Sequence, residues 1–197
     1  MVSEVDICNR GLIKVHAPLI TSLTQDSPEA ILCNAVYDQI RDEVLRAHFW
    51  NFAIKQVSLE QLTETPVFEF DYKYALPADY VRVYRLENPN QRYKIKSGEL
   101  HTNQSTMKME YVAKITDTTK FDPMFVTALS LRIGAELAYP LAGSNDRYRE
   151  LLAEYEQYIK MAKRADGQEG TPDSLTADLF VDSRHEYGGS YPVDWTR

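Results

Sequence analysis

Apolar residues recur every three or four positions in the first fifty residues, a spacing typical of amphipathic helices. Ser3 followed by Asp6 resembles a capping box, with Asp in place of the usual Glu or Gln, and predicts a helix over about residues 4–15. The Ser-Pro pair at residues 27–28 combines a good N-cap with a proline at the first helical position. A second helix is therefore expected to begin there and to end near Ala47.

The period of the pattern changes to two in the middle of the chain, as in strands with one buried face. The clearest run is residues 68–76, where Phe, Tyr and Leu alternate with Glu69, Asp71, Lys73 and Ala75. Shorter alternating runs predict strands near residues 55–59, 81–84, 92–96 and 107–115. Turn residues separate these runs and no helical pattern intervenes, so an antiparallel sheet or a small barrel is expected.

Helical spacing returns at Asp122, which is followed by a proline and predicts the start of a third helix. This helix is expected to bury one face and to break at the Tyr-Pro pair of residues 139–140. The expected face consists of Val126, Leu129, Ile133 and Leu137. Ser144 then predicts the N-cap of a fourth helix, with Gly167 as its C-cap.

The order of these elements predicts an α+β protein. The N-terminal and C-terminal helix pairs, in residues 1–50 and 120–166, are expected to form a four-helix bundle. Residues 51–119 are expected to be an inserted antiparallel β segment, and residues 167–197 an extended C-terminal interaction arm.

The arm differs in kind from the rest of the chain. It carries six acidic residues against two basic ones, a local charge of −4, and its glycines and prolines break any periodicity. A segment that only solvates the protein rarely carries large aromatic residues. The arm contains four of them, Phe180, Tyr187, Tyr191 and Trp195, so it is expected to bind a partner.

Composition places the chain among ordinary globular proteins and excludes several classes. Its 197 residues suit one domain or one domain with an elaboration, and 44% hydrophobic with 26% charged residues is unremarkable in a globular protein. A net charge of −7 argues against nucleic-acid binding by the whole surface. A membrane span is not expected, because no run of about 18 apolar residues occurs. An acidic N-terminus without an apolar run predicts no signal peptide, and two cysteines cannot build a disulfide framework.

Residues that could carry chemistry are few. The four histidines, His16, His48, His101 and His185, lack metal-ligand spacing, so no metal or other cofactor is expected. Cys8 and Cys33 lie on apolar helix faces and are interpreted as buried small hydrophobes. Glu69 and Asp71 share a strand face, where they are either a glycosidase-like carboxylate pair or a solvated surface. No catalytic residue is assigned.

Basic residues concentrate in residues 80–96, which hold five bases and one acid. Arg92, Lys94 and Lys96 lie on one side of their strand by the two-residue period. They form either a solvated strand face or a surface that meets an anion. DNA phosphate and the acidic arm of a neighbouring subunit are the two anions considered.

Several short segments, in order, resemble the tail tubular protein A type of head-to-tail adaptor in short-tailed bacteriophages. They cover about residues 5–166, and the arm matches this family less well. The segments are ICNR at 7–10, PLITSL at 18–23, DSPEA at 26–30, RDEVLR at 41–46, WNFA at 50–53, YALPADY at 74–80, FDPMF at 121–125 and ELAYPL at 136–141.

The resemblance implies a structural virion protein rather than an enzyme. Such adaptors form rings of twelve copies between the portal protein and the tail nozzle (tail tubular protein B), and double-stranded DNA passes through the ring during retention and ejection. The resemblance further implies a location at the head–tail interface of the virion, after synthesis in the host cytoplasm, and in some relatives a docking surface for tail fibres. A glycoside hydrolase using paired carboxylates and a host-encoded interaction domain are the alternatives.

Overall fold

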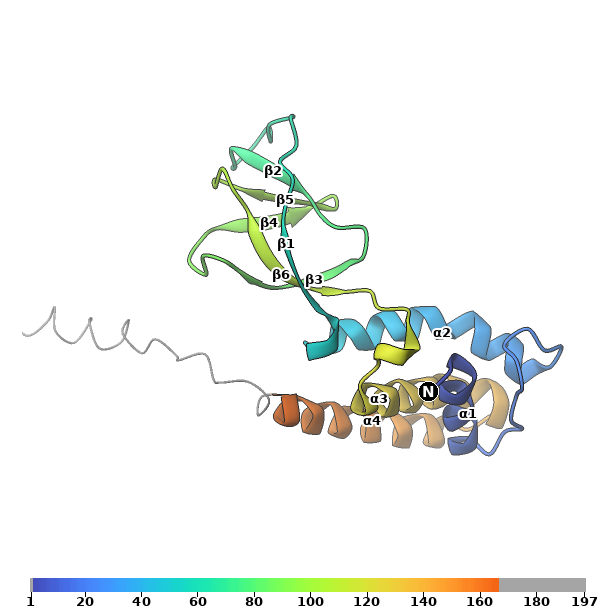
Figure 1. Cartoon of the computed structure of the whole chain (residues 1–197). Helices are drawn as coiled ribbons and strands as arrows, with labels where there is room; N and C mark the ends of the chain where they lie inside the picture. Colours follow the sequence, from blue (N-terminus) through green and yellow to red (C-terminus); the bar gives the residue numbers. More distant parts are fainter. Residues whose placement is uncertain (1, 167–197) are drawn as a thin grey trace, which may run out of the picture.

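The computed structural model describes residues 2–166 of the chain (Figure 1). The arm of residues 167–197, with Phe180, Tyr187, Tyr191 and Trp195, lies outside the described residues, as does His185. The described elements are α1 (Glu4–Lys14), α2 (Pro28–Ala47), η1 (Asn51–Ala53), β1 (Ile54–Ser58), β2 (Tyr72–Ala75), β3 (Tyr80–Leu86), β4 (Tyr93–Lys96), β5 (Glu99–Thr102), β6 (Lys108–Ala113), η2 (Thr118–Lys120), α3 (Pro123–Ala142) and α4 (Asn145–Asp166).

The helix starts predicted from capping residues are confirmed. The Ser3 hydroxyl accepts a hydrogen bond from the Asp6 N–H at 3.1 Å, and the Asp6 carboxylate accepts one from the Ser3 N–H at 2.9 Å. The side chains of Ser27, Asp122 and Ser144 likewise accept backbone N–H groups in the first turns of α2, α3 and α4. These bonds satisfy donors that a helix start otherwise leaves unpaired.

The predicted break at residues 139–140 is wrong, because α3 continues through Pro140 to Ala142. A proline removes one i→i−4 hydrogen bond and crowds the carbonyl four residues earlier, but Pro140 lies in the last turn, where only two helical residues follow it. The helix ends instead at Gly143, whose φ of 63° is left-handed and whose N–H bonds to the carbonyls of Ala138 and Tyr139. A glycine adopts this cap conformation without steric cost.

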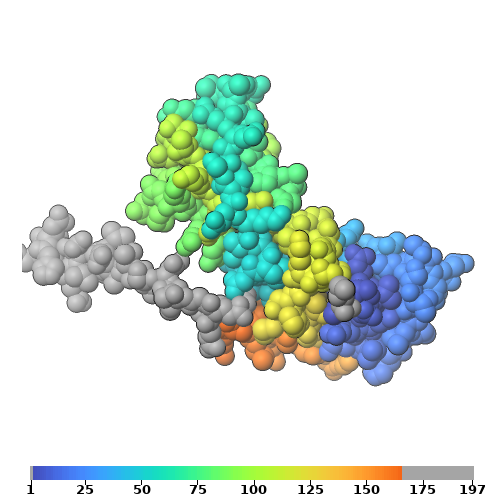
Figure 2. All heavy atoms as spheres, viewed as in Figure 1, coloured from blue at the N-terminus to red at the C-terminus, as the bar shows by residue number. Residues whose placement is uncertain are grey.

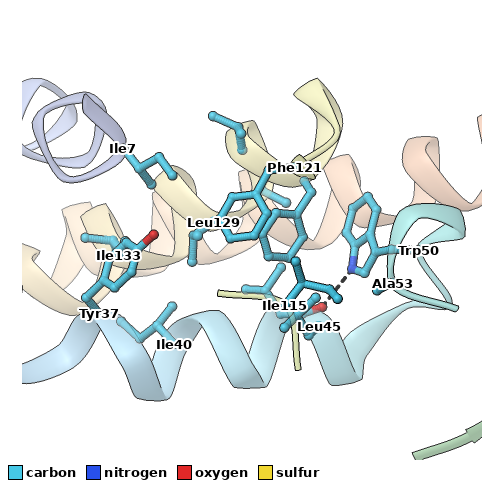
Figure 3. Close-up of a cluster of buried hydrophobic side chains, with 14 of the residues drawn as sticks. Ile7, Tyr37, Ile40, Leu45, Trp50, Ala53, Ile115, Phe121, Leu129 and Ile133 are labelled. Carbon is cyan, nitrogen blue, oxygen red and sulfur yellow. Dashed lines mark hydrogen bonds between the residues drawn. The ribbon is translucent and has the colours of Figure 1, made fainter. Parts of the chain in front are cut away.

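Helix α3 is the centre of the helical unit, and α1, α2 and α4 each pack chiefly against it. Eleven of its twenty residues are buried, on every side of the helix. Figure 3 shows Leu129 and Ile133 of α3 among side chains from the surrounding helices, including Ile7 and Tyr37. Although α3 is the most apolar helix, none of the helices in residues 2–166 has the length and apolarity needed to cross a membrane.

The expected four-helix bundle with a small inserted segment is therefore wrong. The structure has four helices around a buried α3 and two three-stranded antiparallel sheets. Helices α1 and α2 touch only slightly, so they do not form a pair that packs against α3 and α4. The spacing of Val126, Leu129, Ile133 and Leu137 predicted one buried face. It missed the small residues, such as Ala128 and Ala135, that let neighbours pack on the other faces.

Gly11 of α1 and Gly134 of α3 set the closest approach of these two helices. A Cβ atom added at Gly11 would lie 3.1 Å from the Gly134 nitrogen and 3.1 Å from the Ser130 carbonyl oxygen. A Cβ added at Gly134 would lie 3.1 Å from the Gly11 carbonyl oxygen. Both glycines are buried, so the two backbones meet without intervening side chains.

The β unit contains two antiparallel sheets with strand orders β1-β6-β3 and β2-β5-β4. Strands near the predicted positions of β1, β3, β4 and β6 are present, whereas β5 was not predicted. The turn at Ser97 and Gly98, followed by the alternation of Leu100 and Thr102, is the signal for β5, because it closes a tight hairpin with β4.

The β unit stands off one side of the helical unit, as Figure 2 shows, and the chain passes between the units twice. Two reciprocal hydrogen bonds hold the junction: Arg46 donates to the Val81 carbonyl at 2.6 Å, and Arg82 donates to the Arg46 carbonyl at 2.7 Å. The Arg82 guanidinium also lies 3.8 Å from the centroid of the Phe49 ring. These contacts attach β3 directly to the end of α2.

Substituting Gly11 by Ala is expected to lower the free energy of unfolding by about 1–3 kcal/mol, the usual cost of overpacking. Two of the three atoms that the new methyl group meets belong to backbone and cannot rotate away. Urea unfolding of the two proteins measures the difference. The matched control is Asn34→Ala on the exposed face of α2, for which a change of about 0.5 kcal/mol or less is expected. An equal effect of both substitutions would contradict the close approach.

Candidate functional site

Cations gather on one face of the β2-β5-β4 sheet. The strand register places Lys73, His101 and Lys94 side by side across the three strands. Lys96, two residues after Lys94, lies on the same face because side chains alternate along a strand. The opposite face carries Tyr74 and other apolar residues that are buried in the core of the β unit.

The loop of residues 63–71 brings two carboxylates to these cations. Glu64 accepts a hydrogen bond from Lys73 at 2.8 Å. Both carboxylate oxygens of Glu69 accept from the Lys94 ammonium, at 2.7 and 2.8 Å. Arg92 and Lys96 each lie 3.4 Å from a Glu69 oxygen, so all three predicted cations meet one carboxylate on one side of the sheet.

Glu69 has a backbone φ of 76°, in the left-handed region that costs a non-glycine residue on the order of 1 kcal/mol or more. The strand predicted over residues 68–76 is accordingly wrong in its first half, since β2 comprises only Tyr72–Ala75. The Phe70 N–H donates to the Phe68 carbonyl across a tight turn. Ion pairs to three cations outweigh the local preference for an extended strand.

The turn leaves two apolar side chains exposed, Val67 and Phe68, of which Phe68 was expected to lie in a strand. Val67 is fully exposed and Phe68 is 77% exposed, whereas Phe70 is buried with the Lys96 ammonium 5.8 Å from its ring centroid. Pro66, directly before Val67, was the available signal for a loop at this position. Together with the three cations, the two displayed residues form a surface that we call the basic–apolar patch: Val67, Phe68, Arg92, Lys94 and Lys96.

The patch has an excess of positive charge. Arg92, Lys94 and Lys96 face the carboxylate of Glu69 and that of Glu99, which lies opposite Lys96 in the strand register, so the formal surplus is one positive charge. The three cationic side chains are between 41% and 79% exposed, whereas the Glu69 side chain is only 19% exposed. The hydrogen bond from Lys94, with help from Lys96, holds the pKa of Glu69 below its ordinary value. The patch therefore exposes its cationic groups and apolar side chains more than it exposes the side chain of its anion.

Glu69 and Asp71 do not form the carboxylate pair considered from the sequence. They lie in a turn rather than on one strand face, and the Asp71 backbone N–H donates to the Asn103 side chain at 3.0 Å. A glycosidase acid needs a raised pKa so that it is protonated when it meets the substrate. The cations around Glu69 act in the opposite direction.

The two cysteines and His48 are buried packing residues. Cys8 and Cys33 are fully buried, and a hydrogen bond with Cys33 together with burial raises the pKa of the Cys8 thiol. His48 is buried with its ring edge-on to Trp50. Within residues 2–166, no three or more His, Cys, Asp or Glu side chains are placed to hold a metal ion together.

An open depression of about 900 Å³ lies over one end of the β1-β6-β3 sheet. Its lining includes the apolar Val57, Leu86 and Met109. The charged groups around it pair with one another, Arg85 with Glu110 at 2.6 Å and Lys108 with Glu87 at 2.8 Å. The depression thus offers apolar contact and no surplus charge that would orient a polar ligand.

The chain was compared with models of known protein families and with curated proteins, and neither comparison finds a match.

The pH dependence of the patch follows from the lowered pKa of Glu69. Because the folded pKa lies below the ordinary value of 4.5, the ion pairs stabilise the loop fully above that value. Their contribution is lost as the pH falls through the folded pKa. NMR titration is expected to find a Glu69 pKa below 4.5 that rises towards that value in the Arg92→Gln, Lys94→Gln, Lys96→Gln triple variant. An unchanged pKa in the triple variant would show that the cations do not hold the carboxylate.

Proposed function

We propose that this chain is a structural subunit of a bacteriophage virion, a head-to-tail adaptor that assembles into a ring between the portal protein and the tail nozzle. The observation that carries the proposal is the basic–apolar patch. In it, Val67 and Phe68 are exposed to solvent on a loop that ion pairs hold in place. The ordered segments that resemble tail tubular protein A adaptors give the proposal its particular form.

An assembly subunit accounts for the exposed apolar side chains better than a monomer does. Apolar patches that a protein keeps exposed commonly mark surfaces that a partner covers. The helical unit adds further exposed apolar residues at a distance from the patch. These are Ile13, Leu19, Ile31, Tyr139 and Met161. A ring subunit needs lateral contacts of about 800 Å² on each partner, together with contacts above and below the ring.

Charge also fits an adaptor ring. The chain has a net charge of −7, and a channel of acidic subunits lets DNA pass without binding it tightly. The surplus positive charge of the patch is a local exception to this balance. It suits contact with an acidic protein surface better than contact with DNA in transit.

A glycoside hydrolase is the alternative from another class, and the surroundings of Glu69 disfavour it, since three cations keep the carboxylate ionised. Loss of a sugar-cleaving activity in a single carboxylate-to-amide variant would support that alternative. The neighbouring genes distinguish a host-encoded interaction domain from an adaptor. Portal and tail-tube genes next to the gene for this chain would favour the adaptor.

Mixing the purified protein with portal rings is expected to yield a complex that carries up to twelve copies of this chain. Native mass spectrometry measures the number bound. The control is the Val67→Ser, Phe68→Ser variant, which should bind more weakly because the apolar contact is lost while the fold is kept. A wild-type protein that stays monomeric and never binds portal or nozzle would contradict the proposed function.

A chain that ends at Asp166 is expected to lose most of its ring or portal assembly, because the acidic arm with its four aromatic residues is absent. Circular dichroism of the truncated protein checks that the helices and strands persist. The matched change is replacement of residues 167–197 by a glycine–serine segment of equal length, which should fail to assemble in the same way. Full assembly of both variants would remove the arm from the mechanism.

A further inference from the structure

The basic–apolar patch keeps one surplus positive charge after Glu69 and Glu99 are counted. Glu69 is shared by Arg92, Lys94 and Lys96. Any further anion must come from outside the loop and from a molecule that also covers Val67 and Phe68. The complementary ligand is a peptide in which carboxylates flank apolar residues.

This chain contains such a peptide in its arm. Residues 178–182 read Asp-Leu-Phe-Val-Asp, two carboxylates around three apolar residues. No basic residue occurs between Gly167 and Arg184, so the charge of this stretch is purely negative. A phosphate backbone, the other anion considered, would supply charge but would leave Val67 and Phe68 exposed to water.

We propose that residues 178–182 of one copy dock on the basic–apolar patch of the next copy, with Asp178 and Asp182 on the cations and Phe180 against Val67 and Phe68. The proposal rests on the proposed function, because the ring brings copies side by side. In this arrangement each subunit places its arm on one neighbour and receives the arm of the other neighbour on its own patch. Head-to-tail contacts of this kind close into rings.

The length of the chain permits this contact. The twelve residues from Asp166 to Asp178 span up to about 40 Å when extended. Figure 1 shows α4 at the base of the molecule and the β2-β5-β4 sheet at the far end of the β unit. A segment of this length that leaves the helical unit can extend well beyond it, as contact with another copy requires.

Cross-linking between two proteins that each carry one added cysteine tests the proposal. Full-length Val67→Cys is mixed with full-length Ser183→Cys and treated with a short bismaleimide. Cys8 and Cys33 are fully buried in both proteins, and wild-type chain measures any background from them. A mixed dimer is expected, and it should form at least about tenfold faster than with Ile31→Cys, an exposed residue on the helical unit, in place of Val67→Cys.

Charge variants separate docking from chance encounter. In the Lys94→Gln, Lys96→Gln background, the rate of mixed cross-linking is expected to fall about tenfold, and it should fall equally in the Asp178→Asn, Asp182→Asn background. Combining Lys94→Glu and Lys96→Glu in one protein with Asp178→Lys and Asp182→Lys in the other is expected to restore much of the rate. Raising the salt concentration should weaken the wild-type reaction.

Three results would overturn the proposal. The first is equal cross-linking of the Val67 and Ile31 cysteines. The second is a product that forms only within one chain carrying both the Val67 and Ser183 cysteines. The third is loss of the cross-link between the Val67→Cys and Ser183→Cys proteins when duplex DNA is added, since DNA would then be the preferred anion. None of these results depends on portal binding. The experiments can therefore contradict the docking of the arm without contradicting the adaptor function, and the reverse.

Discussion

Close packing around α3 is the constraint on which the helical unit depends. A helix buried on every side needs small residues wherever a neighbour's backbone approaches, and Gly11 and Gly134 supply them where α1 crosses α3. At the other end of α3, Phe125 contacts Trp50 and Phe52, with ring centroids 5.3 and 5.1 Å away. The same aromatic cluster therefore anchors the segment through which the chain enters the β unit. The position of the β unit depends on the helical core and on the two hydrogen bonds beside it, from Arg46 to the Val81 carbonyl and from Arg82 to the Arg46 carbonyl.

The loop of residues 63–71 combines two opposing contributions to the free energy. The left-handed backbone at Glu69 is unfavourable, and the ion pairs of its carboxylate with Arg92, Lys94 and Lys96 are favourable. Exposed ion pairs are individually weak, but three cations on one shielded carboxylate act together. The outcome is a surface with apolar residues in front and surplus cations beside them. Strained backbone that persists because its surroundings over-determine it is often found at functional positions.

An adaptor accounts for these features together. A braced apolar loop, apolar side chains on the helical unit and an acidic arm rich in aromatic residues are all surfaces that gain free energy when covered. Glu69, the residue that came closest to a catalytic assignment in the sequence, is more simply understood as the internal anchor of a binding surface. Its cations hold it ionised, which suits an anchor and does not suit a general acid.

The sequence by itself determined the elements whose signals are local. Ser3, Ser27, Asp122 and Ser144 mark helix starts because capping depends only on the adjacent turn, and the two-residue spacing of Arg92, Lys94 and Lys96 places them on one side of the sheet. Only the tertiary structure decided three other features: burial of α3 on all sides, continuation of α3 through Pro140, and the turn at Glu69. The burial of α3 and the turn at Glu69 depend on groups distant in the chain. The alternating pattern of residues 68–76 favoured a strand. Pro66 was a local signal for a loop before it, but no local rule could show that cations more than twenty residues away would meet Glu69 in a turn.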